Sequence, residues 1–142
     1  MRYKIEVRQY QVKVAEPGAA NVHEPADVAK MLTPEFNPLQ EEMHVLMLDT
    51  ACNVVDKVLV AKGQSGSVYC QPVDVIRPMM FSNANRAILA HNHPSGNLEP
   101  SQEDLAFTRK MQEAFRTMGL TLLDHIIYTA TGHCSFKGKG LL

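Results

Sequence analysis

The chain has 142 residues, of which 45% are hydrophobic and 20% charged, which is typical of a single folded domain and not of a disordered segment. Fourteen Lys and Arg residues against fifteen Asp and Glu residues give a net charge of −1, which excludes a generally basic nucleic-acid-binding protein. No apolar run is long enough for a membrane span, and three widely spaced cysteines form no disulfide framework, so we expect a cytoplasmic protein.

The first half of the chain predicts a strand, a helix and a hairpin. Loosely alternating apolar residues predict a strand over Arg2–Val14, followed by a loop. Proline in the first turn predicts a short helix over Pro25–Leu32. The hairpin is predicted from two apolar runs on either side of a turn, Glu41–Leu48 and Val54–Val60, and a glycine-containing loop follows at Gly63–Gly66.

The second half predicts strands that alternate with helices. Ser101–Met118 is the clearest helix, because Ser101 is a good N-cap and apolar residues recur at helical spacing. The other predicted elements are a helix at Val73–Arg86, a short buried strand at Arg86–Ala90 that leads into His91, and a strand at Leu120–Thr129. This alternation predicts a mixed α/β domain with a central sheet.

His91 and His93 are the most informative of the six histidines in the chain. Residues two apart in an extended chain point to the same side, and Pro94 favours extended geometry at the residue before it. Both imidazoles can therefore face one point at the end of a strand, while Asn92 points the other way. This spacing favours a pair of metal ligands over two unrelated surface histidines.

Asp104 is the candidate third ligand, because the loop after His93 can fold the start of the next helix back against the strand end. Two histidines and one aspartate would leave the fourth position of a zinc ion free for water, whose pKa falls to about 7 when it is bound. A carboxylate that accepts the proton of this water would complete a hydrolase, and Glu41 and Glu42 are the candidates.

Several of these polar residues also have purely structural interpretations. Ser101 and Asp104 form the S-x-x-D pattern of a helix capping box, which is compatible with a place in the site. His23 and His44 have no partners in the sequence and are expected at the surface or a sheet edge. Asp124–His125 lies within an apolar strand, where a buried hydrogen-bonded pair is more plausible than a catalytic one.

The stretch HNHPSGNLEPSQED, residues 91–104, resembles a known family. Its pattern H-x-H-x7-S-x2-D is similar to the JAMM signature of the MPN-plus metalloproteases. The wider string resembles the JAB-like domain of the RadC family, and the segments EPADVAKML, EEMHVLMLDTACNVV, SNANRAILA and LLDHIIYT extend the resemblance over residues 23–142. Residues 1–22 are expected to be a strand-like extension in place of the helical region common in longer members.

The resemblance implies a three-layer α/β/α sandwich with a mixed central sheet, similar to cytidine deaminases. It implies that His91, His93 and Asp104 bind Zn²⁺, that Glu41 is the general acid/base, in preference to Glu42, and that Ser101 donates a hydrogen bond to the developing oxyanion. The implied reaction is zinc-dependent hydrolysis of an amide or isopeptide bond in a peptide or protein conjugate.

Two other functions remain as alternatives. The family name suggests a factor associated with DNA repair or replication, or a metal-dependent nuclease. The near-neutral charge disfavours DNA binding, although a local basic face could form from Arg2, Lys4, Arg8, Lys137 and Lys139. A non-catalytic interaction module ranks last, because all of the proposed ligands are present. The sequence does not predict the oligomeric state.

Overall fold

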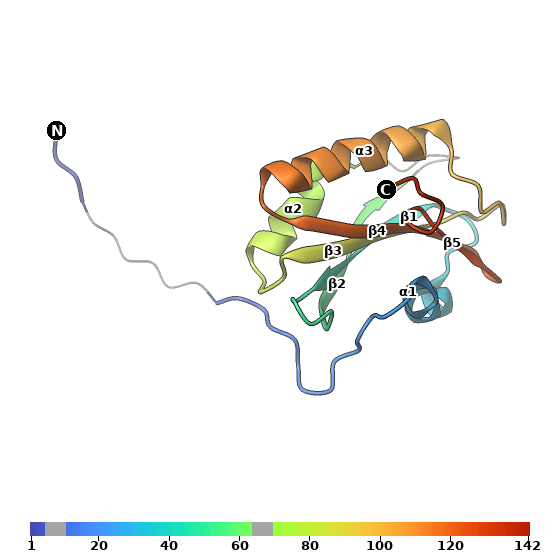
Figure 1. The fold of residues 1–142 in the computed structure, drawn as a ribbon, viewed down its shortest axis with the longest axis horizontal. Coiled ribbons are helices and arrows are strands. Elements are labelled where there is room, and N and C mark those ends of the chain that lie inside the picture. The colour runs from blue at the N-terminus through green and yellow to red at the C-terminus, as the bar shows by residue number, and fades with distance from the viewer. Residues whose placement is uncertain (5–10, 64–69) are drawn as a thin grey trace.

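The computed structural model describes residues 1–4, 11–63 and 70–142, and Figure 1 shows their arrangement. Within these described ranges, five strands form one sheet in the order β2-β1-β3-β4-β5. Neighbouring strands are antiparallel except β3 and β4, which are parallel. The strands are β1 (Glu42–Leu48), β2 (Val54–Lys62), β3 (Arg86–Asn92), β4 (Thr121–Tyr128) and β5 (His133–Ser135).

Helices cover both faces of this sheet (Figure 1). One face carries α1 (Pro25–Leu32) and a short 3-10 turn, η1 (Thr33–Glu35), and the other carries α2 (Pro72–Met80) and α3 (Gln102–Thr117). Successive residues of β1 contribute to two separate cores, since Val45 and Met47 pack on the α2 and α3 side while Leu46 packs on the α1 side. The predicted three-layer α/β/α sandwich with a mixed sheet is confirmed.

Local sequence signals account for where the helices begin. Both α1 and α2 have proline in the first turn, where a missing N–H costs no helical hydrogen bond. At the start of each helix an aspartate carboxylate also accepts from a backbone N–H three residues earlier, Asp27 from Glu24 and Asp74 from Gln71. The predicted bounds of α1 are confirmed, and the hairpin of β1 and β2 is present as expected.

The second helix is shorter than the sequence predicted. It ends at Met80 instead of continuing to Arg86. Pro78 lies inside the helix and has no N–H to donate to the carbonyl of Asp74, which weakens the last turns of the helix. The N–H groups of Phe81 and Ser82 then bond to the carbonyls of Pro78 and Met79, which closes the last turn and releases the chain toward β3.

The strand predicted over Arg2–Val14 is not found in the part of this segment that is described, residues 1–4 and 11–14. Only Lys13 makes an isolated bridge there, with Ser82. The side chains of Tyr3, Val12 and Val14 are exposed, so at these described positions the apolar residues do not form a buried face. Residues 5–10, and all of the predicted loop at 63–66 except Gly63, lie outside the described residues.

None of the helices in the described ranges has the length and apolar character needed to cross a bilayer. Cys52, Cys70 and Cys134 all carry free thiols, in agreement with the absence of a disulfide framework in the sequence.

Candidate metal centre

The two histidines of the H-x-H pattern lie at the end of β3. His91 is within the strand and His93 follows its last residue, Asn92. The side chain of Asn92 points to the opposite face, where its amide donates to the carbonyls of Asn37 and Gln40. Alternation along the strand therefore places both imidazoles on the same side of the sheet, as predicted, and this is the side that carries α3.

The loop after His93 brings the start of α3 back to the end of β3, beside the two histidines. Gly96 has a φ of +82° and its N–H donates to the carbonyl of His93, so a tight turn starts directly at the second histidine. At the start of α3, the Oγ of Ser101 accepts from the N–H of Asp104 at 3.0 Å. The Oδ2 of Asp104 accepts from the N–H of Ser101 at 2.9 Å. This capping box fixes the orientation of the Asp104 carboxylate.

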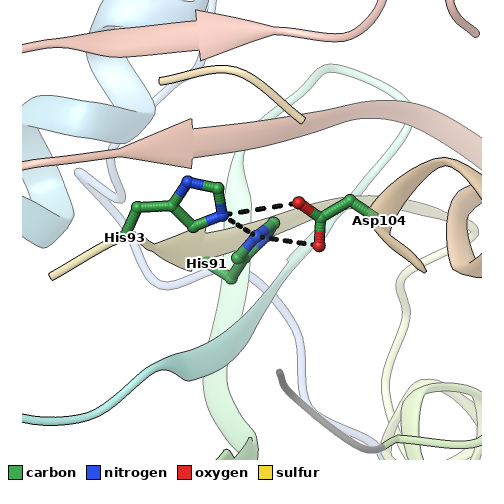
Figure 2. Close-up of side chains that lie close together, drawn as sticks. All are labelled: His91, His93 and Asp104. Atoms are coloured by element: carbon green, nitrogen blue, oxygen red, sulfur yellow. Dashed lines mark hydrogen bonds and ion pairs between the residues drawn. The ribbon is translucent and has the colours of Figure 1, made fainter. Parts of the chain in front are cut away.

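His91, His93 and Asp104 converge in space, as Figure 2 shows. The Nε2 atoms of the two histidines are 3.0 Å apart. The Nε2 of His91 lies 3.3 Å from Oδ1 of Asp104, and that of His93 lies 3.4 Å from Oδ2. Within the described ranges, these three residues are the only group of His, Cys, Asp and Glu side chains close enough to hold one metal ion.

These separations fit the donor set of a zinc ion. Zinc binds imidazole nitrogen and carboxylate oxygen at about 2.0–2.2 Å in tetrahedral geometry, which places neighbouring ligand atoms about 3.3–3.5 Å apart. The two nitrogen-to-oxygen separations, 3.3 and 3.4 Å, fall in this range, but His91 is paired with Oδ1 and His93 with Oδ2. With one ligand atom from each residue the group spans up to 4.8 Å, so the carboxylate would turn to present one oxygen to a bound ion. The two nitrogens, at 3.0 Å, are slightly closer and would need to move apart by a few tenths of an ångström.

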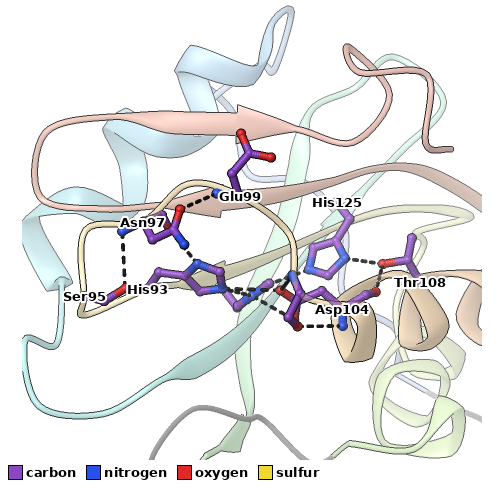
Figure 3. Close-up of polar contacts among 9 residues, drawn as sticks. His93, Ser95, Asn97, Glu99, Asp104, Thr108 and His125 are labelled. Carbon is purple, nitrogen blue, oxygen red and sulfur yellow. Dashed lines mark hydrogen bonds and ion pairs between the residues drawn. The ribbon is translucent and has the colours of Figure 1, made fainter.

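The ring of His93 is held in the tautomer that a metal ligand requires. Its Nδ1 lies 2.6 Å from the carbonyl oxygen of Asn97, which can only accept a hydrogen bond (Figure 3). Nδ1 therefore carries the proton, and the lone pair of a neutral ring is at Nε2, which faces Asp104. A backbone carbonyl is a common second partner for a metal-binding histidine.

The electrostatics of the cluster favour a cation. Burial raises the pKa of Asp104, but hydrogen bonds from His91 and His93 in their protonated forms, together with the charge of His91, lower it by more, so its net pKa is well below the ordinary value. Burial lowers the pKa of His93, but Asp104, the Asn97 carbonyl and the charge of Glu41 outweigh that effect and raise it. The carboxylate is thus ionised, and positive charge is stabilised at the point where the three side chains meet.

Glu41 and Glu42 face opposite sides of the sheet. Met43 pairs with His91 across the antiparallel β1–β3 ladder, so the next same-face position places Glu41 alongside His93. The charge of Glu41 accordingly acts on His93. The Oε1 of Glu42 instead accepts from Asn37 at 2.9 Å, on the far face. Glu41, and not Glu42, is therefore on the side of the cluster.

Two polar residues that the sequence did not connect with the site adjoin it. His125, on β4, is fully buried, with its Nε2 2.7 Å from Nδ1 of His91. Its Nδ1 lies 2.6 Å from Oγ1 of Thr108, on α3 (Figure 3). Burial lowers the pKa of His125 well below its usual value. The prediction of a buried, hydrogen-bonded residue at this position is confirmed, but its partners were not foreseen.

The prediction for His44 was wrong. This residue is only 4% exposed, because β1 is a central strand that is buried on both faces. His23 is exposed, as expected. The spacing of Asp104 and Thr108, one helical turn apart, was the only sequence signal that could have linked Thr108 with the site.

Comparisons with known proteins agree on one family. Residues 22–141 match the family described as the RadC-like JAB domain. Among curated relatives, a UPF0758 protein of Clostridium perfringens is 35% identical over 131 residues, covering 92% of this chain and 58% of the relative. UPF0758 proteins of Aquifex aeolicus and Salinibacter ruber are 34% and 38% identical over 86% and 83% of this chain. The chain spans 53% and 51% of the lengths of these two relatives.

Proposed function

The chain belongs to the RadC-like JAB domain family, and we propose that it is a zinc-dependent hydrolase that cleaves an amide or isopeptide bond in a peptide or protein conjugate. The observation that carries this proposal is the convergence of two imidazole nitrogens and one carboxylate, which lie close enough together to hold one metal ion. His91, His93 and Asp104 would hold the zinc. A zinc ion in such a site supplies Lewis acidity, which makes an attacking water available near neutral pH.

Glu41 would act as the general acid/base. The strand register puts Glu41 next to His93, and the charge of Glu41 acts on His93. Its carboxylate would accept a proton from the attacking water. The water oxygen bonds to the carbonyl carbon, and the proton passes from Glu41 to the departing nitrogen when the C–N bond breaks. The same group thus serves as base and then as acid, which avoids expelling an unprotonated amide nitrogen.

Ser101 would stabilise the negative charge that develops on the carbonyl oxygen. Its Oγ uses a lone pair to accept from the N–H of Asp104, so its own O–H proton is available to donate. A donor fixed in place by a helix cap needs little reorganisation when the charge forms. The structural role and the catalytic role of this residue are therefore compatible.

The balanced charge of the chain favours an amide over a phosphodiester as the substrate. Its net charge is −1, whereas proteins that bind DNA neutralise the phosphates with clustered Lys and Arg. This contrast favours peptide or conjugate hydrolysis over the nuclease alternative.

The test uses zinc-loaded protein, chelated protein and chelated protein with zinc restored. Each is incubated with a peptide library, with isopeptide-linked conjugates and with DNA oligonucleotides, and new termini are detected by mass spectrometry. We expect cleavage of an amide or isopeptide substrate that is lost on chelation and regained with zinc. Cleavage of DNA alone, or metal-independent cleavage, would contradict the proposal.

A further inference from the structure

A continuous chain of hydrogen bonds connects His91 with the backbone of Asp104 through two buried side chains. His91 Nδ1 is 2.7 Å from Nε2 of His125. His125 Nδ1 is 2.6 Å from Oγ1 of Thr108. Thr108 Oγ1 is 2.7 Å from the carbonyl oxygen of Asp104. These hydrogen bonds thus begin on one residue of the candidate metal centre and end on another. Figure 3 shows the part between His125 and Thr108.

The direction of each bond in this chain follows from its fixed end. A backbone carbonyl can only accept, so the Thr108 hydroxyl donates its single proton to Asp104. Toward His125, Thr108 can then only accept, which places a proton on Nδ1 of His125. His125 is fully buried and stacks on the ring of Phe136, with centroids 4.4 Å apart. A second proton would bury an uncompensated charge there.

A neutral His125 with its proton on Nδ1 leaves Nε2 as an acceptor. Nδ1 of His91 must therefore donate to it. The remaining lone pair of a neutral His91 is then at Nε2, the atom that faces His93 and Asp104. The order of donors and acceptors is determined step by step from the Asp104 carbonyl to the metal-facing nitrogen.

We propose that Thr108 and His125 are positioning residues that hold His91 in the tautomer and orientation with Nε2 free for a metal ion. This inference rests on the proposed function, because it assumes a metal at the cluster. His93 obtains the same tautomer directly from the carbonyl of Asn97. The acceptor for His91 is an imidazole, which could donate or accept, so its state has to be set by Thr108.

A matched pair of variants at Thr108 separates the hydroxyl from the shape of the side chain. Thr108→Val keeps the shape of the side chain but removes the oxygen that accepts from Nδ1 of His125. The proton of His125 can then move to Nε2, where it would face the N–H at Nδ1 of His91. Thr108→Ser keeps the hydroxyl. We expect Thr108→Val to weaken zinc binding about 10- to 100-fold in a chelator competition assay, as for other residues that hold metal-ligating histidines, and Thr108→Ser to bind within about threefold of the original protein.

The tautomer itself can be measured without any variant. Two-bond proton–nitrogen NMR of ¹⁵N-histidine-labelled protein should show His125 neutral and protonated at Nδ1, with and without zinc. In Thr108→Val this pattern should change, even if the variant is less stable. His125 protonated at Nε2 in the original protein, or undiminished zinc affinity in folded Thr108→Val, would overturn the inference. Absence of zinc binding in the original protein would instead contradict the proposed function, while the NMR result would still decide the tautomer.

Discussion

Glu41 and Glu42 are neighbours in sequence, but the pleat of β1 and its approach segment directs them to opposite faces of the sheet. Glu41 acts on His93, while Glu42 accepts from Asn37 and lies 3.6 Å from Nζ of Lys62. From the sequence, only the family resemblance favoured Glu41 over Glu42 as the general acid/base. The face of the sheet on which each carboxylate lies depends on the register of β1 with β3, which the sequence does not show.

We predict that Glu41→Gln lowers the turnover rate about 10²- to 10⁴-fold, the usual contribution of a general acid/base, without loss of bound zinc. Glu42→Gln is the matched control and should keep most of the activity. Both are measured as turnover of the substrate found in the library test, with zinc content determined on the same samples. Normal turnover in Glu41→Gln would remove it from the proposed mechanism.

His44 gives the protein a dependence of stability on pH. Burial lowers its pKa and outweighs the charge of Glu42, which raises it, while Lys57 and Glu35 have smaller and opposite effects. In the unfolded chain a histidine has a pKa of about 6.5. Above that pH, His44 is neutral in both the folded and the unfolded protein. As the pH falls below it, the imidazole binds a proton more readily in the unfolded chain than in the folded one.

The free energy of unfolding should therefore decrease as the pH is lowered from 7 toward 5, and His44→Leu should show a smaller decrease. Urea denaturation of metal-free protein at several pH values measures both. The Nδ1 atom of His44 has no hydrogen-bond partner among the described residues, so replacement by an apolar side chain breaks no bond at that atom. An equal decrease in the two proteins would show that His44 is not responsible.

Among the helices and strands, α3 contributes both to the stability of the fold and to the candidate metal centre. The capping box at its start also holds the carboxylate of Asp104 in place. We predict that Ser101→Ala lowers the free energy of unfolding by about 1 kcal/mol, the typical contribution of an N-cap side chain. Ser101→Thr should lose less, since threonine also caps. Thermal or urea denaturation measures the difference, and an unchanged stability in Ser101→Ala would argue against the cap.

Local chemistry explains which elements could be predicted from the sequence. α1 begins with a proline in its first turn, and α3 begins directly after the capping residue Ser101. Both features can be recognised within a short stretch of sequence. The contact of His91 with His125 depends on the parallel pairing of β3 with β4, in which His91 lies opposite Ile127. Such pairing is not encoded in a local pattern, so His125 was expected to be buried but not to adjoin the cluster.

The same limit applies to the N-terminal segment. Alternation of apolar residues predicts a strand only if another strand is available to pair with it. In the described residues of this segment, Lys13 alone bridges to Ser82, and Tyr3, Val12 and Val14 remain exposed. The resemblance to a known family begins after this segment, and the matched family region begins at residue 22.

For the molecule as a whole, the candidate ligands connect the end of β3 with the first turn of α3. A metal bound only by the folded state stabilises it by mass action, by about 2.7 kcal/mol when free zinc is about 100 times its Kd. We therefore predict that chelation lowers the melting temperature and that added zinc restores it. Asp104→Ala should melt at the same temperature with and without zinc. A melting temperature that does not respond to zinc in the original protein would contradict a site of this kind.

The central claim is that His91, His93 and Asp104 hold one divalent metal ion. Elemental analysis of protein purified without chelators, at known protein concentration, tests it most directly. We predict about one zinc per chain in the original protein and little or none in His91→Ala or Asp104→Ala variants that remain folded. The absence of stoichiometric divalent metal from the original protein, or its retention in both variants, would contradict the account.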